Sequence, residues 1–242
     1  NVLPEKIGPH DSPITHWART LTKIDDMHFT GHHGIAVGDA NGDGLDDIYV
    51  CDGGGLPNRL YLQNPDGTTR DVSAQAGVDR LESSKSALFL ELDDDGDRDL
   101  VVATVALLLG LENNGKATVS LRGGIPGMSN PQSLSAADYD GDGDLDVLSA
   151  YGSGFSPNAT IAWYENDGAG NFTTQPPIFT TSGTGYLDAV YAADLDGDGD
   201  LDVLSASVSD EIAWYQNDGA GNFVKQSPIT TIADAANSVY AA

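Results

Sequence analysis

A nine-residue acidic segment that recurs four times is the strongest constraint on how this chain folds. The copies read DANGDGLDD, ELDDDGDRD, DYDGDGDLD and DLDGDGDLD and occupy residues 39–47, 91–99, 138–146 and 194–202. Their first residues are 52, 47 and 56 positions apart, and every copy has glycine at its sixth position. A solvated acidic surface requires neither a recurring period nor that glycine. The chain is therefore expected to consist of structural repeats joined by loops of variable length.

Each repeat predicts four short β-strands. In the last repeat the segments that predict them are 187–193, 203–207, 212–216 and 223–232. Asn-Asp-Gly or Asn-Asn-Gly follows the third segment at 113–115, 166–168 and 217–219, as in tight hairpin turns. No long segment has the period of a helix, so none is expected. Because units of this size cannot bury their own faces, the expected fold class is all-β, a β-propeller or propeller fragment of four-stranded blades, with four complete repeats and a partial fifth.

The balance of charge excludes several classes of partner. The chain has 11 Lys and Arg against 37 Asp and Glu, a formal charge of -26, and 20 of the acids lie in the four segments. This field opposes phosphate backbones and anionic membrane surfaces, so no nucleic acid is expected as a partner. No apolar run approaches the roughly 20 residues that span a bilayer, so no direct membrane insertion is expected. The single cysteine, Cys51, excludes a disulfide within the chain and is expected to be a small buried hydrophobe.

The spacing of the acids predicts a calcium-binding loop. Oxygens from positions 1, 3 and 5, the backbone carbonyl of position 7 and the carboxylate of position 9 can surround one hard cation, which takes 6 to 8 oxygen ligands. Leu45 at position 7 fits only a backbone ligand, and Glu91 at position 1 predicts a distorted or weaker second site. About four Ca²⁺ sites are expected, which would raise the formal charge from -26 to about -18. The predicted metal ligands are Asp39, Asn41, Asp43, Leu45, Asp47, Glu91, Asp93, Asp95, Asp97, Asp99, Asp138, Asp140, Asp142, Asp144, Asp146, Asp194, Asp196, Asp198, Asp200 and Asp202.

An EF-hand, a purely solubilising surface and a magnesium site all fit the segment less well than a calcium loop. An EF-hand requires flanking helices and an acid at position 12, which here is Val50, Val102, Ser149 or Ser205. Acids that only solubilise the chain would not require glycine at position 6 in every copy. Magnesium prefers a stricter octahedral geometry with retained waters, and ligands that are all oxygen do not indicate a redox metal.

The acidic loops, together with WYENDGAGNF at 163–172 and WYQNDGAGNF at 214–223, resemble the FG-GAP and VCBS-type repeats of integrin-α-like calcium-binding β-propellers. The resemblance covers about residues 31–242, and the segment 51–78 is similar to repeat proteins of the ASPIC/UnbV type. It implies a secreted or cell-surface propeller, extracellular or periplasmic, whose cations brace the blades and whose ligands bind loops on a propeller face.

Both ends of the chain depart from a complete member of that family. Residues 1–30 are expected to be a leader of a mature or trimmed product, within which 17–24 could form a strand that closes the ring. The segment SVYAA at 238–242 matches AVYAA at 189–193 and is expected to begin a fifth blade. A small closed ring of about five blade positions and an open fragment of a larger propeller both remain open. An open fragment would expose sheet edges and favour self-association through its ends.

The expected function is a calcium-binding extracellular module for adhesion or for binding a protein or carbohydrate ligand. One alternative is a carbohydrate-active propeller enzyme, a lyase or hydratase. It would depend on the five histidines, with His32 and His33 as its candidate pair, and all five lie in the first 33 residues: His10, His16, His28, His32 and His33. Another alternative is an architectural subunit of a surface or filamentous assembly. Four aromatic residues could contact a ligand: Trp163, Tyr164, Trp214 and Tyr215. Because side chains alternate between the two faces of a strand, packing between blades is the favoured role.

Overall fold

The structure of this chain is a computed structural model that describes residues 34–53, 56–125, 130–152, 158–181, 186–207, 211–233, 236 and 238–239. All four acidic segments lie within these ranges. The expected leader and its closing strand, the five histidines and most of the expected fifth-blade strand lie outside the described residues.

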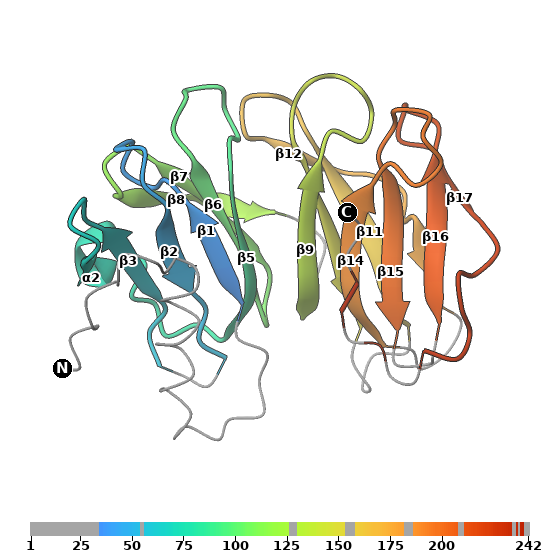
Figure 1. The fold of residues 1–242 in the computed structure, drawn as a ribbon, viewed down its shortest axis with the longest axis horizontal. Helices are drawn as coiled ribbons and strands as arrows, with labels where there is room; N and C mark the ends of the chain where they lie inside the picture. The colour runs from blue at the N-terminus through green and yellow to red at the C-terminus, as the bar shows by residue number, and fades with distance from the viewer. Residues whose placement is uncertain are drawn as a thin grey trace.

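The described chain folds into four antiparallel sheets, called blades 1 to 4 here, each built from consecutive strands (Figure 1). Blade 1 contains β1 (Ile35–Gly38), β2 (Asp47–Val50), β3 (Arg59–Gln63) and β4 (Thr69–Asp71). Blade 2 contains β5 (Ser84–Leu90), β6 (Asp99–Thr104), β7 (Leu108–Asn113) and β8 (Val119–Ile125). Blade 3 contains β9 (Pro131–Ala137), β10 (Asp146–Tyr151), β11 (Thr160–Asn166), β12 (Phe172–Thr174) and β13 (Phe179–Thr180), which also pairs with β11. Blade 4 contains β14 (Leu187–Ala193), β15 (Asp202–Ser207), β16 (Ile212–Asn217) and β17 (Phe223–Lys225). The predicted all-β fold of four-stranded repeats is confirmed.

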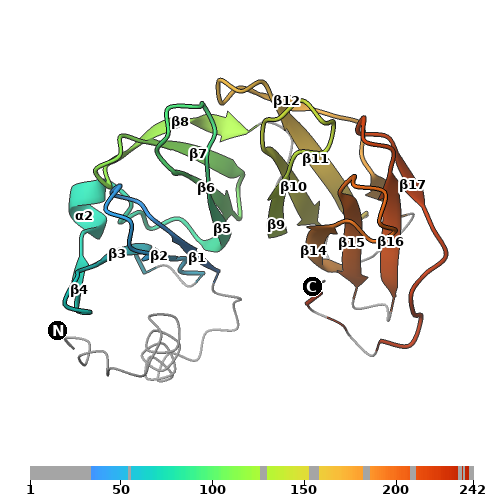
Figure 2. The ribbon, with the colours of Figure 1, turned by 45° about the horizontal axis from the view of Figure 1, so that its top comes forward.

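The blades follow one another around an arc, with the first strand of each blade on the inner side (Figure 2). Along this inner side β1 contacts β5, β5 contacts β9, and β9 contacts β14. Each acidic segment joins the first strand of its blade to the second, and the four loops lie at one end of the molecule, at the top of Figure 1. The repeat therefore places four chemically similar loops side by side along the arc.

Within the part of the chain that the structure describes, the prediction of no helix is wrong at one place. A single helical turn, α2 (Ser73–Ala76), follows β4 and ends at Gly77, whose φ of 77° forms a left-handed C-cap. Four residues are too few to produce a 3.6-residue hydrophobic period, so the sequence pattern could not reveal this turn.

Three hydrophobic clusters fill the spaces between successive blades. Trp163 belongs to the cluster between blades 3 and 4, and the next residue, Tyr164, belongs to the cluster between blades 2 and 3. Neighbouring side chains thus point to opposite faces of β11, and the predicted packing role of this aromatic pair is confirmed. Cys51 lies in the cluster between blades 1 and 2, where burial raises the pKa of its thiol to about 12, as expected for a buried hydrophobe.

Candidate metal centres

The carboxylate at position 1 shapes each acidic loop by accepting N–H groups from the loop itself. Asp194 accepts the N–H of Gly197 at 2.7 Å and that of Gly199 at 3.2 Å, one on each carboxylate oxygen. Asp39 and Asp138 accept the equivalent pairs of N–H groups in their own loops. The glycine at position 6 has a φ of 82°, 87°, 101° and 99° in the four successive loops, so the predicted sharp turn is confirmed.

Three of the loops bring together the carboxylates of positions 1, 3 and 9. Within each group one oxygen from every carboxylate lies within 4.8 Å of the others, and the groups are Glu91, Asp93 and Asp99; Asp138, Asp140 and Asp146; and Asp194, Asp196 and Asp202. The first loop has Asp39 and Asp47 at positions 1 and 9 and the amide of Asn41 at position 3. Positions 1, 3 and 9 therefore form the candidate metal centres.

The predicted ligands at positions 5 and 7 are not members of these three close groups. Each position-5 carboxylate accepts the backbone N–H of position 7, at 2.9 Å, 2.9 Å, 2.9 Å and 3.0 Å in Asp43, Asp95, Asp142 and Asp198. The position-7 side chains of the last three loops pack against the hairpin glycine of their own blade, in the pairs Asp97 and Gly115, Asp144 and Gly168, and Asp200 and Gly219. Ligation by positions 5 and 7 stays a prediction.

The aspartate at position 9 is fully buried in all four loops. In blade 3 the two oxygens of Asp146 accept the N–H groups of Tyr139, in its own loop, at 3.1 Å and of Asn166, at the end of β11, at 2.9 Å. Burial raises the pKa of Asp146 to about 7, and it raises the pKa of Asp47 and of Asp99 to about 6, although the same backbone donors act in the opposite direction. In blades 1, 2 and 3 position 9 thus ties the loop to the third strand while burial disfavours its negative charge.

The donor set and one unpaired atom fit a hard cation. All side-chain donors in the three groups are carboxylate oxygens, which Ca²⁺ prefers over softer ligands. Asp93 Oδ1 is buried and has no hydrogen-bond partner. A buried acceptor without a partner is costly, and a cation held between positions 1, 3 and 9 of this loop would satisfy it.

A buried asparagine, predicted only as part of a turn, connects each of the last three blades to the loop of the blade before it. Asn113, at the end of β7, donates from Nδ2 to the carbonyl of Ala40, in the loop of blade 1, at 2.8 Å and to that of Arg98, in its own loop, at 2.9 Å. Asn166 donates in the same way to Leu92 and Leu145, and Asn217 donates to Tyr139 and Leu201. The recurrence of this asparagine at the start of the three turns at 113–115, 166–168 and 217–219 was a usable signal, but its partner in another blade was not visible in the sequence.

The second loop differs from the others in three ways. Glu91 stands at position 1, and Asp94 at position 4 has a φ of 60° where the other loops have glycine. The guanidinium of Arg122, in β8, lies beside the loop, with Nη1 2.5 Å from Asp93 Oδ2 and 3.5 Å from Glu112 Oε2. Arg122 therefore places a protein cation next to one candidate metal centre, a contact that no motif in the sequence indicated.

Comparison with curated proteins finds relatives that share one name. A curated relative, Cartilage acidic protein 1 of Xenopus tropicalis, is 29% identical over 229 residues, a match that covers 84% of this chain and 35% of the relative. The protein of the same name from Homo sapiens is 27% identical over 164 residues, covering 61% of this chain and 24% of the relative. This chain therefore spans about a third or less of the length of these two proteins.

A solved structure gives a similar fold. An Agrocybe aegerita lectin, described as recognising non-reducing terminal N-acetylglucosamine, aligns with a TM-score of 0.50 at 21% identity and covers 81% of this chain and 51% of its own. Among the described residues, no helix has the length and apolar character needed to cross a membrane. The family model of the FG-GAP-like repeat matches residues 39–102, 91–149, 138–205 and 194–242, and each match starts at the first residue of an acidic loop. The chain belongs to the family of proteins built from FG-GAP-like repeats.

Proposed function

We propose that this chain is a calcium-braced β-propeller module of an extracellular protein and that it binds a partner molecule. The observation that carries the proposal is the recurrence of three carboxylates within 4.8 Å of one another at the same end of successive blades. An extracellular setting is supported by the two relatives, which are named for cartilage. Extracellular fluids hold calcium at the millimolar level at which weak sites of this kind fill.

The residues of the chain couple metal binding to the order of the blades. Bound Ca²⁺ would supply positive charge between carboxylates that otherwise repel one another. Asp146 links its loop to β11 through Asn166 N–H, and Asn166 Nδ2 links the same blade to Leu92 in the loop of blade 2. An ordered acidic loop therefore holds the third strand of its own blade and the asparagine of the next blade. The free energy of metal binding then contributes to the free energy of folding.

Thermal unfolding in a calcium titration tests the metal-binding part of the proposal. The midpoint temperature is expected to rise with calcium, to rise much less with magnesium and to fall in EDTA. Asp39→Asn is expected to lower the number of bound calcium ions by one, measured by calorimetric titration. Asp46→Asn is the matched control, because Asp46 is an exposed acid of the same loop at a position with no predicted ligand. A midpoint temperature that changes with neither calcium nor EDTA, in a protein that retains no metal, would overturn the proposal.

The second loop is proposed as the weakest of about four calcium sites. Its longer Glu91 side chain, the strained Asp94 and the neighbouring Arg122 all distinguish it from the other loops. The enzymatic alternative stays a prediction, because His32 and His33 lie outside the described residues. Self-association through the blade edges and an architectural role also stay predictions.

A further inference from the structure

Two pockets occupy equivalent places in successive gaps between blades. The pocket between blades 3 and 4 has a volume of about 390 Å³, and the pocket between blades 2 and 3 has a volume of about 240 Å³. Each is lined by the third strand of one blade, by the segment that pairs with it, and by the hairpin of the next blade. We call them the 3–4 pocket and the 2–3 pocket.

The internal repeat relates the two pockets residue by residue. Every residue that lines the 2–3 pocket has a counterpart that lines the 3–4 pocket, at the same position relative to the buried asparagine or to the hairpin turn of its blade. Half of these pairs are identical, and two more exchange a glycine for a proline. The remaining two differences change what the pocket offers a ligand: Gly110 of the 2–3 pocket corresponds to Trp163, and Arg122 corresponds to Gln175.

In the 2–3 pocket the chain supplies its own guanidinium. Arg122 contacts the carboxylates of Asp93 and Glu112, at 2.5 Å and 3.5 Å, and donates from Nη2 to the backbone carbonyl of Ala169 in the hairpin of blade 3. One planar cation therefore joins the acidic loop, the third strand and the next blade. This fork of contacts is characteristic of arginine and is not reproduced by an ammonium group.

In the 3–4 pocket the equivalent acceptors remain, but the cation is absent. Asp140, Glu165 and Ala220 occupy the places of Asp93, Glu112 and Ala169, and all three line the pocket. The residues that line it include no Lys or Arg. Gln175 takes the place of the arginine and donates one hydrogen bond to Glu165. Among the described residues no side chain donates to Asp140, whereas its counterpart in blade 4, Asp196, receives a hydrogen bond from Gln216 at 2.5 Å.

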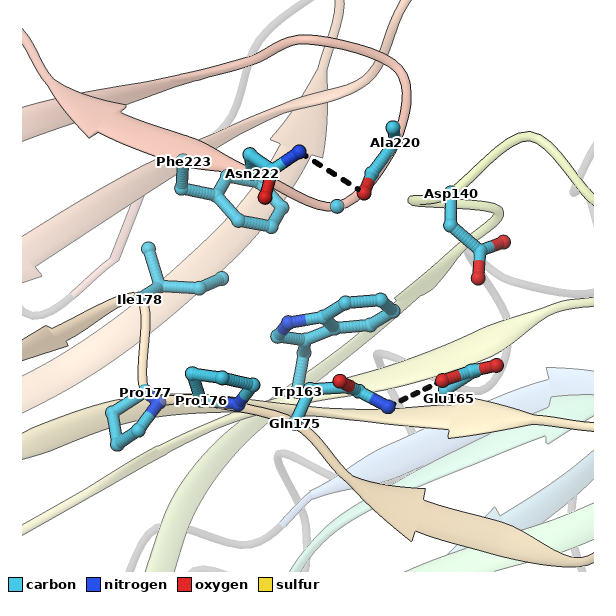
Figure 3. Close-up of a pocket in the computed structure, with 11 residues that line it drawn as sticks. Asp140, Trp163, Glu165, Gln175, Pro176, Pro177, Ile178, Ala220, Asn222 and Phe223 are labelled. Carbon is cyan, nitrogen blue, oxygen red and sulfur yellow. Dashed lines mark hydrogen bonds between the residues drawn. The ribbon is translucent and has the colours of Figure 1, made fainter.

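The 3–4 pocket also has an aromatic wall. Figure 3 shows the indole of Trp163 between Gln175 and Glu165 on one side and Asn222 and Phe223 on the other. Trp163 is held in place by edge-to-face contacts with Tyr139 and Phe223, with ring centroids 6.0 Å and 6.2 Å away. An indole beside two carboxylates favours a cation over an anion.

We propose that the 3–4 pocket binds the guanidinium of an arginine side chain from a partner protein, which takes the place that Arg122 fills in the 2–3 pocket. Asp140, Glu165 and the carbonyl of Ala220 accept its N–H groups, and it lies beside the small part of Trp163 that lines the pocket, since this side chain is 4% exposed. Pro176, Pro177 and Ile178 line the rest of the pocket and suit the methylene stem of the side chain. The inference deepens the partner-binding part of the proposed function, and the formal charge of -26 favours a basic partner over an acidic one.

Calcium and arginine can share the acidic loop. In the second loop Asp93 directs Oδ2 to Arg122, while its Oδ1 is buried without a hydrogen-bond partner. Asp140 has the same position in the third loop, where its Oδ1 accepts the N–H of Asp142 at 3.3 Å. The contact with Arg122 thus uses one oxygen of the position-3 carboxylate and leaves the other oxygen for the loop.

The test uses the full chain in saturating calcium and three probes: an arginine-containing tripeptide amide, the same tripeptide with citrulline, and N-acetylglucosamine. Binding is followed through the indole N–H signal that Trp163→Phe removes from the NMR spectrum. The arginine peptide is expected to shift this signal, and the uncharged citrulline peptide is expected to bind at least about tenfold more weakly. Equal binding of the two peptides, no binding of the arginine peptide, or a shift caused by the sugar alone would overturn the proposal.

Two substitutions localise the effect. Gln175→Arg would fill the 3–4 pocket with the chain's own guanidinium and is expected to abolish peptide binding. Gln226→Arg is the matched control, because Gln226 holds the equivalent place in blade 4 and does not line this pocket. Peptide binding that survives Gln175→Arg, or that is lost in both variants, would contradict the assignment. If the peptide does not bind but the midpoint temperature still rises with calcium, the arginine site is wrong and the proposal of a metal-stabilised scaffold is retained. The two experiments therefore distinguish the two proposals.

Discussion

Asn113 connects two blades through a single buried amide. Its Nδ2 bonds the carbonyls of Ala40 and Arg98, and its Oδ1 accepts the N–H of Asn114 at 2.9 Å. It is 3% exposed, so that removing its amide takes one donor from each of these carbonyls, while the Ala40 carbonyl keeps the N–H of Ala117 at 2.9 Å.

Asn113→Ala is expected to lower the free energy of unfolding by about 1 to 2 kcal/mol, because two hydrogen bonds of a buried amide are lost. Asn114→Ala, one residue further along the same turn, is expected to change it by less than about 0.5 kcal/mol, because Asn114 is exposed. Urea unfolding in saturating calcium measures both. Similar losses in the two variants would show that the bridge to blade 1 contributes nothing beyond the turn itself.

At the level of the elements, features determined by neighbouring residues were predictable and those determined across blades were not. Gly199 and its three counterparts could be assigned to a sharp turn, because a positive φ is a local demand of the loop. The grouping of positions 1, 3 and 9 was part of the predicted ligand set, since loop spacing alone brings them together. Arg122 escaped notice because its contact with Asp93 spans 29 residues and its contact with Ala169 spans 47. That Gly110 and Trp163 hold equivalent places in two pockets becomes visible only when the blades are compared as equivalent units in three dimensions.

In the absence of metal, the buried aspartate of the acidic loop should lower the free energy of unfolding as pH rises. Burial raises the pKa of Asp146 to about 7 in the folded state from its ordinary value of 3.8, so the folded chain binds more protons than the unfolded chain between these values. The free energy of unfolding in EDTA therefore receives a contribution from Asp146 that falls as pH rises from about 4 to 7. In calcium the direction should reverse, because metal ligation requires the ionised carboxylate.

Urea titrations at several pH values in EDTA check this expectation. Asp146→Asn removes the titrating group, so its unfolding free energy should decline less steeply over the same pH range than that of the unsubstituted chain. Parallel pH profiles for the two proteins would contradict the assignment of a raised pKa to this buried carboxylate.

For the whole molecule, the formal charge of -26 should make stability depend on salt. With calcium removed, the midpoint temperature is expected to rise between about 0.02 M and about 0.5 M NaCl, because salt screens repulsion between exposed charges separated by more than a Debye length. In saturating calcium the rise should be smaller, since part of the repulsion is already neutralised. Calorimetry in a series of NaCl concentrations measures the difference, and an equal rise with and without calcium would speak against metal at the acidic loops.

The asparagine bridges also give the array a direction. Asn113, Asn166 and Asn217 all reach from a later blade to the loop of the one before it. The equivalent carbonyl of blade 4 is that of Leu195, and no described residue donates a hydrogen bond to it. Blades of this kind consequently join head to tail, with an acceptor offered on one side and a donor on the other. The asparagine of an engineered repeat placed after blade 4 could donate to the carbonyl of Leu195. A repeat placed before blade 1 would instead meet Gln63, whose side-chain oxygen is buried without a hydrogen-bond partner.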